Sequence, residues 1–484
     1  MTTTYLTAAL PYVNASPHLG HALELVDIDA VARHWRRRGH HVRTFTGTDD
    51  NARKNVAAAR AAGRPVTELV AERGDEFLAL AEPLGVGLDD TLRTSTDPRH
   101  RTGVAWFWRR WHDAGDLYRD DYEGWYCTGC EAFLDDDRPC PEHERRPERV
   151  TERNWFFRLS RYRDLLRWEI ERGRLRIEPE VRRNEVLATL DDLRDVSVSR
   201  PAHRSEGWGL PVPGDDAQVV YVWIEAVTSY LTALGASPDA PLVGRWWTEA
   251  DRRVHVVGKG ITRFHAVYWP ALLASAGLPL PTDIWVHDHL TVEGRKLSKT
   301  LGTAVDPVAL VDEHSTDAVR WWLLRHHPLR ADVDFTEAGL ADDAETDLAD
   351  LLGNTVHRVV TLANRLGDGR LSEVPDVDDA LDATLDAAVD RYDLGAAVRA
   401  VLDATRDVNR TLEGERPWEL ARDPATIEAA RRVVVEAIGR CRSIVHGASW
   451  IVPDLAAGWS AQLGESDIVG APEVLVRRRE RACR

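Results

Sequence analysis

The chain has 484 residues, a formal net charge of −17 and 43% apolar residues, and it includes 18 tryptophans. This length is too great for one hydrophobic core, so we expect two to four domains, and the apolar content excludes a disordered protein. The negative charge argues against a protein that grips nucleic acid with its whole surface. The sequence has no apolar run of about 20 residues and no leader-like start, so we expect a cytoplasmic protein without a membrane segment.

The first predicted element is a buried strand over residues 3–10 (TTYLTAAL), followed by a loop and a helix. Ser16 and Pro17 predict the N-cap and first turn of that helix, which places His18 and His21 at its start. A helix start collects unpaired N–H groups and attracts anions, above all phosphate. From this motif alone two other interpretations stay open: a pair of metal ligands, or two rings that cap and pack.

Three later segments also predict strands that end in glycine or polar residues, at 42–49, 253–260 and 283–290. Helical stretches follow them, and this alternation is typical of a doubly wound, Rossmann-like parallel sheet. Ligands of such sheets bind at the carboxyl ends of the strands. The predicted fold class is therefore α/β.

Residues 116–209 interrupt the alternation with a stretch rich in Asp, Glu, Arg and Pro, and we expect them to form an inserted domain. This stretch contains Cys127, Cys130, Cys140 and His143, in two pairs that each have two residues between their members. The spacing predicts a tetrahedral zinc-knuckle site that holds one structural Zn²⁺. The alternative is four residues in a loop without a metal.

Lysine is rare in this chain, since only four of the 62 Lys and Arg residues are lysines. Two of these, Lys296 and Lys299, fall in the segment GRKLSKT (294–300). A compact lysine charge suits a site that must follow a moving phosphate, although clustering by chance is the alternative. From residue 341 onward apolar residues recur at three- and four-residue spacing, which predicts a helix bundle.

The segments PHLGH and KLSKT resemble the two signature motifs of class I aminoacyl-tRNA synthetases. The resemblance narrows to the methionyl-tRNA synthetase family and continues in order through LPYVNASPHLGHALE, the GTD turn, YEGWYCTGCEAFL, RNEVLATL, VSVSRP, YVWIEA, FHAVYWPALL, GRKLSKTLGTAVDP, LGNTVHR and RPWEL. It implies adenylation of L-methionine by ATP with Mg²⁺, followed by transfer of the methionyl group to tRNA(Met). The implied domains are a catalytic domain in two halves (1–115 and 210–340), the inserted connective domain (116–209) and a helical anticodon-binding domain (341–484).

The resemblance also implies which residues serve each function. Catalysis falls to His18, His21, Lys296 and Lys299, and ATP binding to these four with Gly20, Gly258 and Ser298. The amino-acid pocket comprises Leu10, Tyr12, Asp49, Trp223, Tyr230 and His265. The anticodon-reading residues are Asn354, Arg358 and Trp418, because a tryptophan can stack an unpaired base.

Three places depart from the family's pattern. The family usually reads Asp-Glu-His-Gly, Tyr-Val-Trp-x-Asp and Gly-Lys-Asp where this chain has Asp49-Asp50-Asn51-Ala52, a segment ending in Glu225, and a segment ending in Gly260. Gly260 replaces a carboxylate that accepts the ribose hydroxyls, and its loss weakens the binding of ATP by about 1–3 kcal/mol. These changes leave two alternatives open: a diverged paralogue that makes an aminoacyl-adenylate for another amino acid or acceptor, or a catalytically inactive tRNA-binding protein. We expect a monomer, since no appended dimerising domain follows the helical segment.

Overall fold

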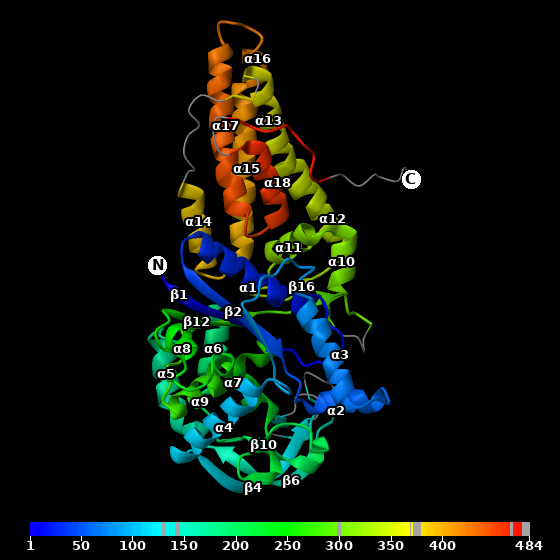
Figure 1. The fold of residues 1–484 in the computed structure, drawn as a ribbon, viewed down its shortest axis with the longest axis vertical. Helices are drawn as coiled ribbons and strands as arrows, with labels where there is room; N and C mark the ends of the chain where they lie inside the picture. Colours follow the sequence, from blue (N-terminus) through cyan, green and yellow to red (C-terminus); the bar gives the residue numbers. More distant parts are fainter. Residues whose placement is uncertain are drawn as a thin grey trace. The chain divides into compact units, whose positions relative to one another are not determined.

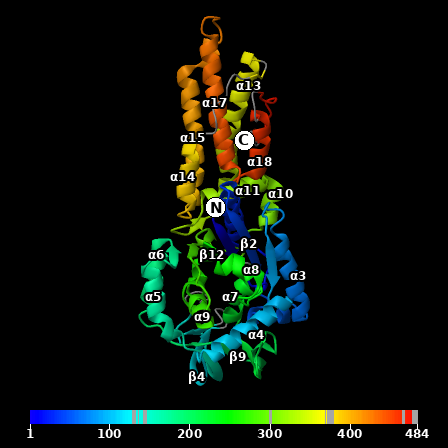
Figure 2. The ribbon, with the colours of Figure 1, turned by 60° about the vertical axis from the view of Figure 1, so that its left-hand side comes forward.

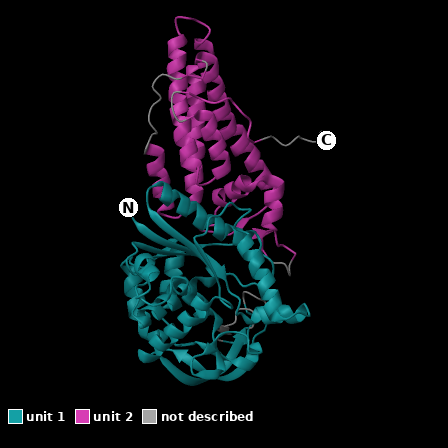
Figure 3. Cartoon of the chain, in the orientation of Figure 1, with its two compact units in different colours: residues 1–289 teal, residues 290–484 magenta. Residues whose placement is uncertain are grey.

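The computed structural model describes residues 1–127, 132–134, 136–140, 146–297, 302–367, 369–370, 379–464 and 468–476. The chain forms two compact units, Met1–His289 (unit 1) and Leu290–Arg484 (unit 2), which Figure 3 shows in different colours. Four predicted site residues lie outside the described residues: Cys130, His143, Ser298 and Lys299. Among the described residues, no helix combines the length and apolar character needed to cross a membrane.

The centre of unit 1 is a six-stranded parallel sheet in the order β3-β2-β1-β12-β13-β7 (Figure 1). The strand order reverses at β1, because the chain continues from β1 to β2 on one side and reaches β12 on the other side much later. In an open parallel sheet, ligands bind at the carboxyl ends of the strands beside such a reversal. The six strands are β1 (Thr3–Ala8), β2 (His41–Thr48), β3 (Asp90–Arg93), β7 (Arg176–Glu178), β12 (Arg252–Gly258) and β13 (Asp283–His287).

The predicted α/β parallel-sheet core is confirmed. The strands predicted at 42–49, 253–260 and 283–290 correspond to β2, β12 and β13, with their ends shifted. The strand predicted at 3–10 begins at Thr3 as expected and ends at Ala8, before the Leu-Pro pair that opens the loop. All of β1 except its first residue is buried, as expected for a central parallel strand.

Aromatic side chains and one long helix enclose the sheet. Tyr5 and Phe45 come from neighbouring strands and contact each other, and Trp247 lies edge-on against Tyr5. Trp269 belongs to the same buried cluster. Helix α1 (Leu19–Arg37) packs along β1, β2 and β12 and buries most of its residues. The ends of β1, β2 and β12 and the start of α1 are thereby held in fixed positions.

The described part of residues 116–209 combines antiparallel strands with the helices α5 (Arg163–Glu171) and α6 (Glu180–Thr189). β4 (Leu117–Cys127) pairs with β6 (Glu148–Phe157) in a sheet of order β5-β4-β6-β8. β7 comes from the same stretch but pairs with β13, so it completes the parallel sheet. The predicted domain boundaries stay predictions.

Unit 2 begins with the small sheet β15-β14-β16 and continues as helices (Figure 2). The long helices α13 (Asn354–Gly367), α15 (Leu394–Glu415) and α17 (Ile427–Ala448) pack against one another. Helix α13 buries Val356, Val359 and Val360 at the three- and four-residue spacing of one helical face. The predicted helical C-terminal region is confirmed.

The remaining elements connect these cores. In unit 1 they are α2 (Arg53–Ala61), α3 (Val66–Ala79), α4 (Pro98–Asp113), β5 (Ala132–Leu134), α5 (Arg163–Glu171), α6 (Glu180–Thr189), β8 (Val196–Ser197), β9 (Ser199–Pro201), β10 (Pro211–Val212), β11 (Asp215–Val220), α7 (Val222–Thr232), α8 (Pro241–Val243) and α9 (Trp269–Ala276). In unit 2 they are β14 (Leu290–Val292), β15 (Arg295–Lys296), α10 (Pro307–His314), α11 (Thr316–Arg325), β16 (Val333–Asp334), α12 (Glu337–Asp343), α14 (Asp379–Val389), α16 (Pro417–Leu420) and α18 (Pro453–Leu463).

Candidate active site

The two histidines of the PHLGH motif cap the start of α1. His18 has extended backbone and is the N-cap, and its Nδ1 accepts the N–H of Gly20 at 3.2 Å. In return, the N–H of His18 donates to Nδ1 of His21 at 3.1 Å. The prediction that Ser16 caps the helix is therefore wrong, because the His18 imidazole takes that role. Ser16 accepts a hydrogen bond from Arg73 Nη1 at 2.6 Å instead.

These capping bonds fix the proton positions on both rings. Each Nδ1 accepts a backbone N–H, so in the neutral ring the proton must lie on Nε2. Burial, followed by the neighbouring His18, lowers the pKa of His21 well below its usual value, which keeps this ring neutral at pH 7. The rings stack with centroids 3.8 Å apart. The start of α1 therefore presents an Nε2–H donor from each imidazole, together with the positive end of the helix dipole.

Tyr230 and His265 form a buried hydrogen bond in the predicted amino-acid pocket. Nδ1 of His265 lies 3.0 Å from the Ile261 carbonyl and donates to it, so Nε2 accepts the Tyr230 hydroxyl proton at 2.7 Å. Burial lowers the pKa of His265 to about 4, so this ring is neutral at pH 7. His265 lies on a π-helical stretch, Phe264–Tyr268, a geometry that often occurs at functional sites.

The predicted aromatic wall is assembled from three separate segments. Trp223 stacks on Phe264 with centroids 4.0 Å apart and lies edge-on to Tyr12 at 5.6 Å. Leu10, Tyr12 and Trp223 are partly buried and pack against the main core of unit 1. Phe264 was not predicted, although the signal was present in its position directly before His265.

Asp49 follows β2 and is almost fully buried, at 1% exposed. Its backbone N–H donates to the Pro11 carbonyl at 2.9 Å, and it forms an isolated parallel bridge with Tyr12. Asn55 Nδ2 contacts the Asp49 carbonyl at 3.2 Å. The structure thus brings Asp49 and Tyr12 together at the carboxyl edge of the sheet, as predicted from the ends of β1 and β2.

Two of the departures from the family's pattern contact each other. Asn51 Nδ2 donates to Glu225 Oε1 at 2.9 Å, and the same oxygen lies 2.6 Å from His100 Nε2. No local sequence pattern predicts this contact, because Asn51 and Glu225 lie 174 residues apart.

Gly258 ends β12, and its Cα pairs with that of His287 on β13. Nε2 of His287 lies 3.2 Å from Glu24 Oε1. Burial opposes the charged imidazole, but the Glu24 carboxylate raises the pKa of His287 above its usual value. Neither Glu24 nor His287 was predicted. The available signal was spacing, because Glu24 lies three residues after His21 and shares its helix face.

In unit 2, a β-hairpin carries the first lysine of the KLSKT motif. Lys296 ends β15 and pairs with Thr291 of β14. Glu293 and Gly294 form the turn with φ of 53° and 69°, the left-handed conformation that a tight hairpin needs. Asp334 Oδ1 accepts the Gly294 N–H at 2.8 Å and the Thr291 hydroxyl at 2.7 Å. The hairpin is therefore fastened by Asp334, which was not predicted.

The predicted anticodon residues are brought together only in part. Arg358 lies over the Trp418 ring, with Cζ 4.5 Å from its centroid, and pairs with Glu413 at 2.7 Å. Asn354 is exposed one turn before Arg358 on α13. Trp418 is partly buried rather than fully exposed.

Two of the four predicted zinc ligands are described. Cys127 and Cys140 are 3% and 1% exposed. Among the described residues, one group of three side chains could hold a metal, Glu313, His314 and Glu337, in unit 2 and outside every predicted site.

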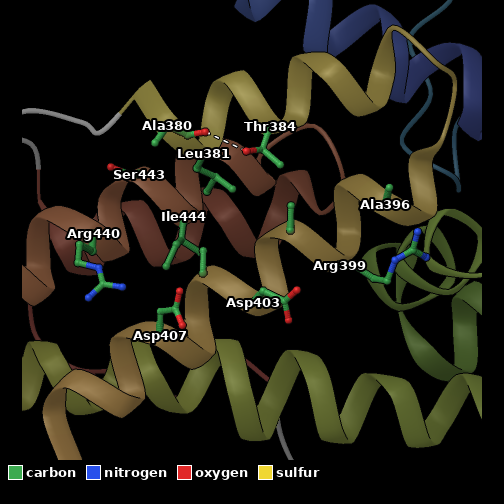
Figure 4. Close-up of a pocket in the computed structure, with 12 residues that line it drawn as sticks. Ala380, Leu381, Thr384, Ala396, Arg399, Asp403, Asp407, Arg440, Ser443 and Ile444 are labelled. Atoms are coloured by element: carbon green, nitrogen blue, oxygen red, sulfur yellow. Dashed lines mark hydrogen bonds between the residues drawn. The ribbon is translucent and has the colours of Figure 1, made fainter. Parts of the chain in front are cut away.

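Unit 2 also contains a groove of about 580 Å³ between α14, α15 and α17 (Figure 4). Figure 4 shows Leu381 and Ile444 in its interior, with Arg440 and Asp407 nearby. None of the predicted site residues lines this groove.

The parallel sheet with its histidine-capped helix at the strand reversal is the arrangement of a class I tRNA synthetase. The family model described as tRNA synthetases class I (M) matches residues 4–149 and 140–360, and the chain belongs to this family.

Curated proteins similar to this chain include methionine–tRNA ligases. The methionine–tRNA ligase of Thermotoga maritima is 37% identical over 87% of this chain and 68% of that protein. The methionine–tRNA ligase of Mycobacterium bovis is 39% identical over 88% of this chain and 85% of that protein. The structure of Mycobacterium tuberculosis methionyl-tRNA synthetase in complex with methionyl-adenylate has a TM-score of 0.90 at 34% identity, and the match covers 99% of this chain and 100% of that one.

Proposed function

We propose that this chain is a methionine–tRNA ligase, which activates L-methionine with ATP and transfers the methionyl group to tRNA(Met). The observation that carries the proposal is the pair of imidazoles at the start of α1, whose Nδ1 atoms are occupied by backbone N–H groups. Their Nε2–H donors and the helix dipole suit the phosphates of ATP at the reversal of the strand order. The kinship with methionine–tRNA ligases supports the same activity.

In the first step, a methionine carboxylate oxygen attacks the α-phosphorus of ATP and the bond to the β-phosphate breaks, which releases pyrophosphate. Negative charge develops on the phosphate oxygens in this transition state. His18 and His21 donate hydrogen bonds to these oxygens, and the lowered pKa of His21 keeps its ring neutral, so that it donates without giving up a proton. Lys296 and Lys299, with Ser298, add positive charge and hydrogen bonding to the leaving pyrophosphate, and Mg²⁺ accompanies the triphosphate.

The amino-acid end of the site discriminates the substrate. Asp49 pairs with the methionine ammonium group beside the Leu10 backbone. Tyr12, Trp223, Tyr230 and His265 surround the thioether, whose polarisable sulfur gains from contact with aromatic rings. The neutral His265 ring suits an apolar substrate, since a charged imidazole there would carry a desolvation cost.

In the second step, a hydroxyl of the terminal adenosine of tRNA attacks the activated carbonyl carbon, and AMP leaves. Asn354, Arg358 and Trp418 bind the anticodon. The contact between Arg358 and the Trp418 ring supports this role, because a supported ring and a planar guanidinium both stack on unpaired bases.

One structural Zn²⁺ is part of the proposal. Cys127, Cys130, Cys140 and His143 would hold it, and four protein ligands leave no open position for a substrate. The burial of the two described thiols suits this role, since a metal-bound thiolate needs shielding from water. Native mass spectrometry tests the site. One zinc ion per chain is expected, and a protein without zinc would contradict the proposal.

We also propose that the protein acts as a cytoplasmic monomer.

Amino-acid-dependent exchange of pyrophosphate into ATP, followed by charging of tRNA, tests the function. We expect exchange with methionine and charging of tRNA(Met). Exchange with another amino acid, or exchange without charging, would instead support the diverged paralogue. Binding of tRNA with no exchange at all would support the inactive tRNA-binding protein.

A further inference from the structure

Three buried polar side chains meet at a single carboxylate oxygen in unit 1. Oε1 of Glu225 lies 2.9 Å from Asn51 Nδ2 and 2.6 Å from His100 Nε2. Because a carboxylate only accepts hydrogen bonds, both nitrogens donate to it. The exposed fractions are 8% for Asn51, 1% for Glu225 and 0% for His100, so water does not compete for these bonds.

The contacts connect three elements that lie far apart in the sequence. Asn51 belongs to the loop after β2, Glu225 to the first turn of α7 and His100 to the first turn of α4. His100 Nδ1 also lies 2.8 Å from Thr232 Oγ1 in the last turn of α7. Asn51 Nδ2 additionally lies 3.4 Å from Thr94 Oγ1. His100 therefore holds both ends of α7, while Asn51 fastens the loop to the start of that helix.

The same contacts join the two chain segments that carry Asp49 and Trp223. Asn51 follows Asp49 by two residues, and Glu225 follows Trp223 by two residues. Asp49 belongs to the polar end of the proposed pocket and Trp223 to its apolar wall. The bond between Asn51 and Glu225 therefore fixes how far apart these two ends lie.

We propose that Asn51 and Glu225 are coupled positioning residues, which set the span of the amino-acid pocket between Asp49 and Trp223; this rests on the function proposed above. His100 holds the carboxylate of Glu225 in the orientation that Asn51 requires. A buried hydrogen bond to a charged group has a large effect when it is broken, because the carboxylate then loses a partner that water cannot replace.

The two substitutions complement each other in length. At position 51 the family usually has His, and this chain has Asn51, whose donor is nearer to the backbone than the outer nitrogen of a histidine. At position 225 the family usually has Asp, and this chain has Glu225, whose carboxylate lies farther from the backbone by one C–C bond, or about 1.5 Å. The shorter donor and the longer acceptor together keep the span between the two chain segments. The pair is therefore expected to tolerate a joint exchange and to resist either single exchange.

A double-mutant cycle of Asn51→His and Glu225→Asp tests the coupling. Exchange of pyrophosphate into ATP is measured at saturating ATP while methionine is varied. Each single variant is expected to raise the KM for methionine about tenfold and to change kcat by less than about threefold. The double variant is expected to return to within about threefold of the wild-type KM. A KM in the double variant equal to the product of the two single effects overturns the proposal.

Two further variants separate positioning from stability. Asp116→Asn is the structural control. Asp116 is 1% exposed and accepts hydrogen bonds from Ser275 at 2.7 Å and Arg161 at 2.8 Å. These three residues lie outside the set proposed for the amino-acid pocket. This variant is expected to lower Tm and leave the KM for methionine unchanged. Glu225→Gln keeps the side-chain length and the Oε1 acceptor, so it is expected to fold and to raise the KM about threefold.

The outcomes distinguish this proposal from the proposed function. A wild-type protein without methionine-dependent exchange contradicts the function itself. A wild-type protein with normal exchange, combined with variants at Asn51 and Glu225 that lower Tm but leave the KM unmoved, overturns the positioning role alone.

Discussion

In unit 1, several buried polar side chains of the proposed site pair with one another, whereas in unit 2 the buried side chains of Asp317 and Arg320 bind the backbone at helix ends. Tyr230 donates to His265, and Asn51 and His100 both donate to Glu225. These groups line or support a proposed substrate pocket. Their side-chain pairing fixes proton positions and distances, which a binding site needs and a helix end does not.

Two buried charges of unit 2, Asp317 and Arg320, bind backbone groups at the ends of helices. Oδ2 of Asp317 accepts the N–H of Leu455 in the first turn of α18, whose own N-cap residue gives no side-chain bond. Arg320 donates to the carbonyls of Trp450 and Ile451, just beyond the end of α17. The difference teaches that burial of polar groups alone does not mark a functional site. The hydrogen-bond partner of the buried group is more informative: a side-chain partner suits a binding site, and a backbone partner suits the end of a helix.

The largest expected effect comes from separating capping from catalysis at His18. In His18→Asn the asparagine still caps α1, because Asn is among the strongest N-cap residues, but the Nε2–H donor is lost. We expect the rate of methionine-dependent exchange to fall about 100-fold, the typical loss for one donor to a transition state, with Tm close to wild type.

His18→Ala is the matched comparison, because it removes both the cap and the donor. It is expected to lose the same activity and also to lower the free energy of unfolding by the cost of a helix cap, about 1 kcal/mol, which lowers Tm. Near-normal exchange in His18→Asn would show that this histidine only caps the helix.

The second prediction concerns the pH dependence of unit 2. Burial raises the pKa of Asp317 to about 6, above the unfolded value of about 3.9. The folded state then holds more protons between these pH values, so stability falls as pH rises from 4 to 6. The total loss is about 2–3 kcal/mol.

The variant Asp317→Asn keeps an acceptor for Leu455 and lacks this titration. Relative to wild type, its free energy of unfolding is expected to rise by about 2–3 kcal/mol between pH 4 and pH 7, measured by urea unfolding of the full chain. Parallel pH profiles for the two proteins would contradict the raised pKa.

The third prediction tests the aromatic contact on α16. Trp418→Ala removes the ring that Arg358 covers, so the ratio of tRNA charging to adenylate formation is expected to fall about tenfold, as for the loss of one stacked base. Trp168→Ala is the matched control, because Arg174 covers Trp168 at 3.4 Å on a helix outside the predicted sites. Equal effects of the two variants would remove the anticodon role from Trp418.

The smallest expected effect is at Tyr230. Tyr230→Phe keeps the ring and leaves His265 Nε2 without its donor, so the KM for methionine is expected to rise about fivefold, within the range of one neutral hydrogen bond. Tyr5→Phe is the control. Tyr5 is equally buried, and its hydroxyl has no hydrogen-bond partner among the described residues. A similar change of KM in both variants would contradict a specific role for the bond.

The sequence predicted the helix start at the PHLGH motif and missed contacts that form across the chain. The bonds of this motif join residues two and three apart, so the helix-start pattern placed both histidines in the right turn but did not predict these bonds. The choice of Ser16 as N-cap was wrong because an imidazole rarely takes that role and the propensity scale favours serine. Glu225 was noted only as a departure, since no local pattern reports a partner 174 residues away.

For the fold, too, long local patterns were predictive and short or long-range features were missed. Alternation of strands and helices predicted the parallel core, but β7 was missed because its three residues are too short to show a period. Asp334 was missed because it supports the KLSKT hairpin from a strand of two residues.

The most direct test of the central claim is competition among substrates. The purified full chain is mixed with ATP and all twenty amino acids at equal concentrations, and the adenylates formed are identified by mass spectrometry. The proposed pocket of Asp49, Trp223, Tyr230 and His265 predicts methionyl-adenylate as the dominant product. Another aminoacyl-adenylate in excess, or no adenylate at all, would contradict the account.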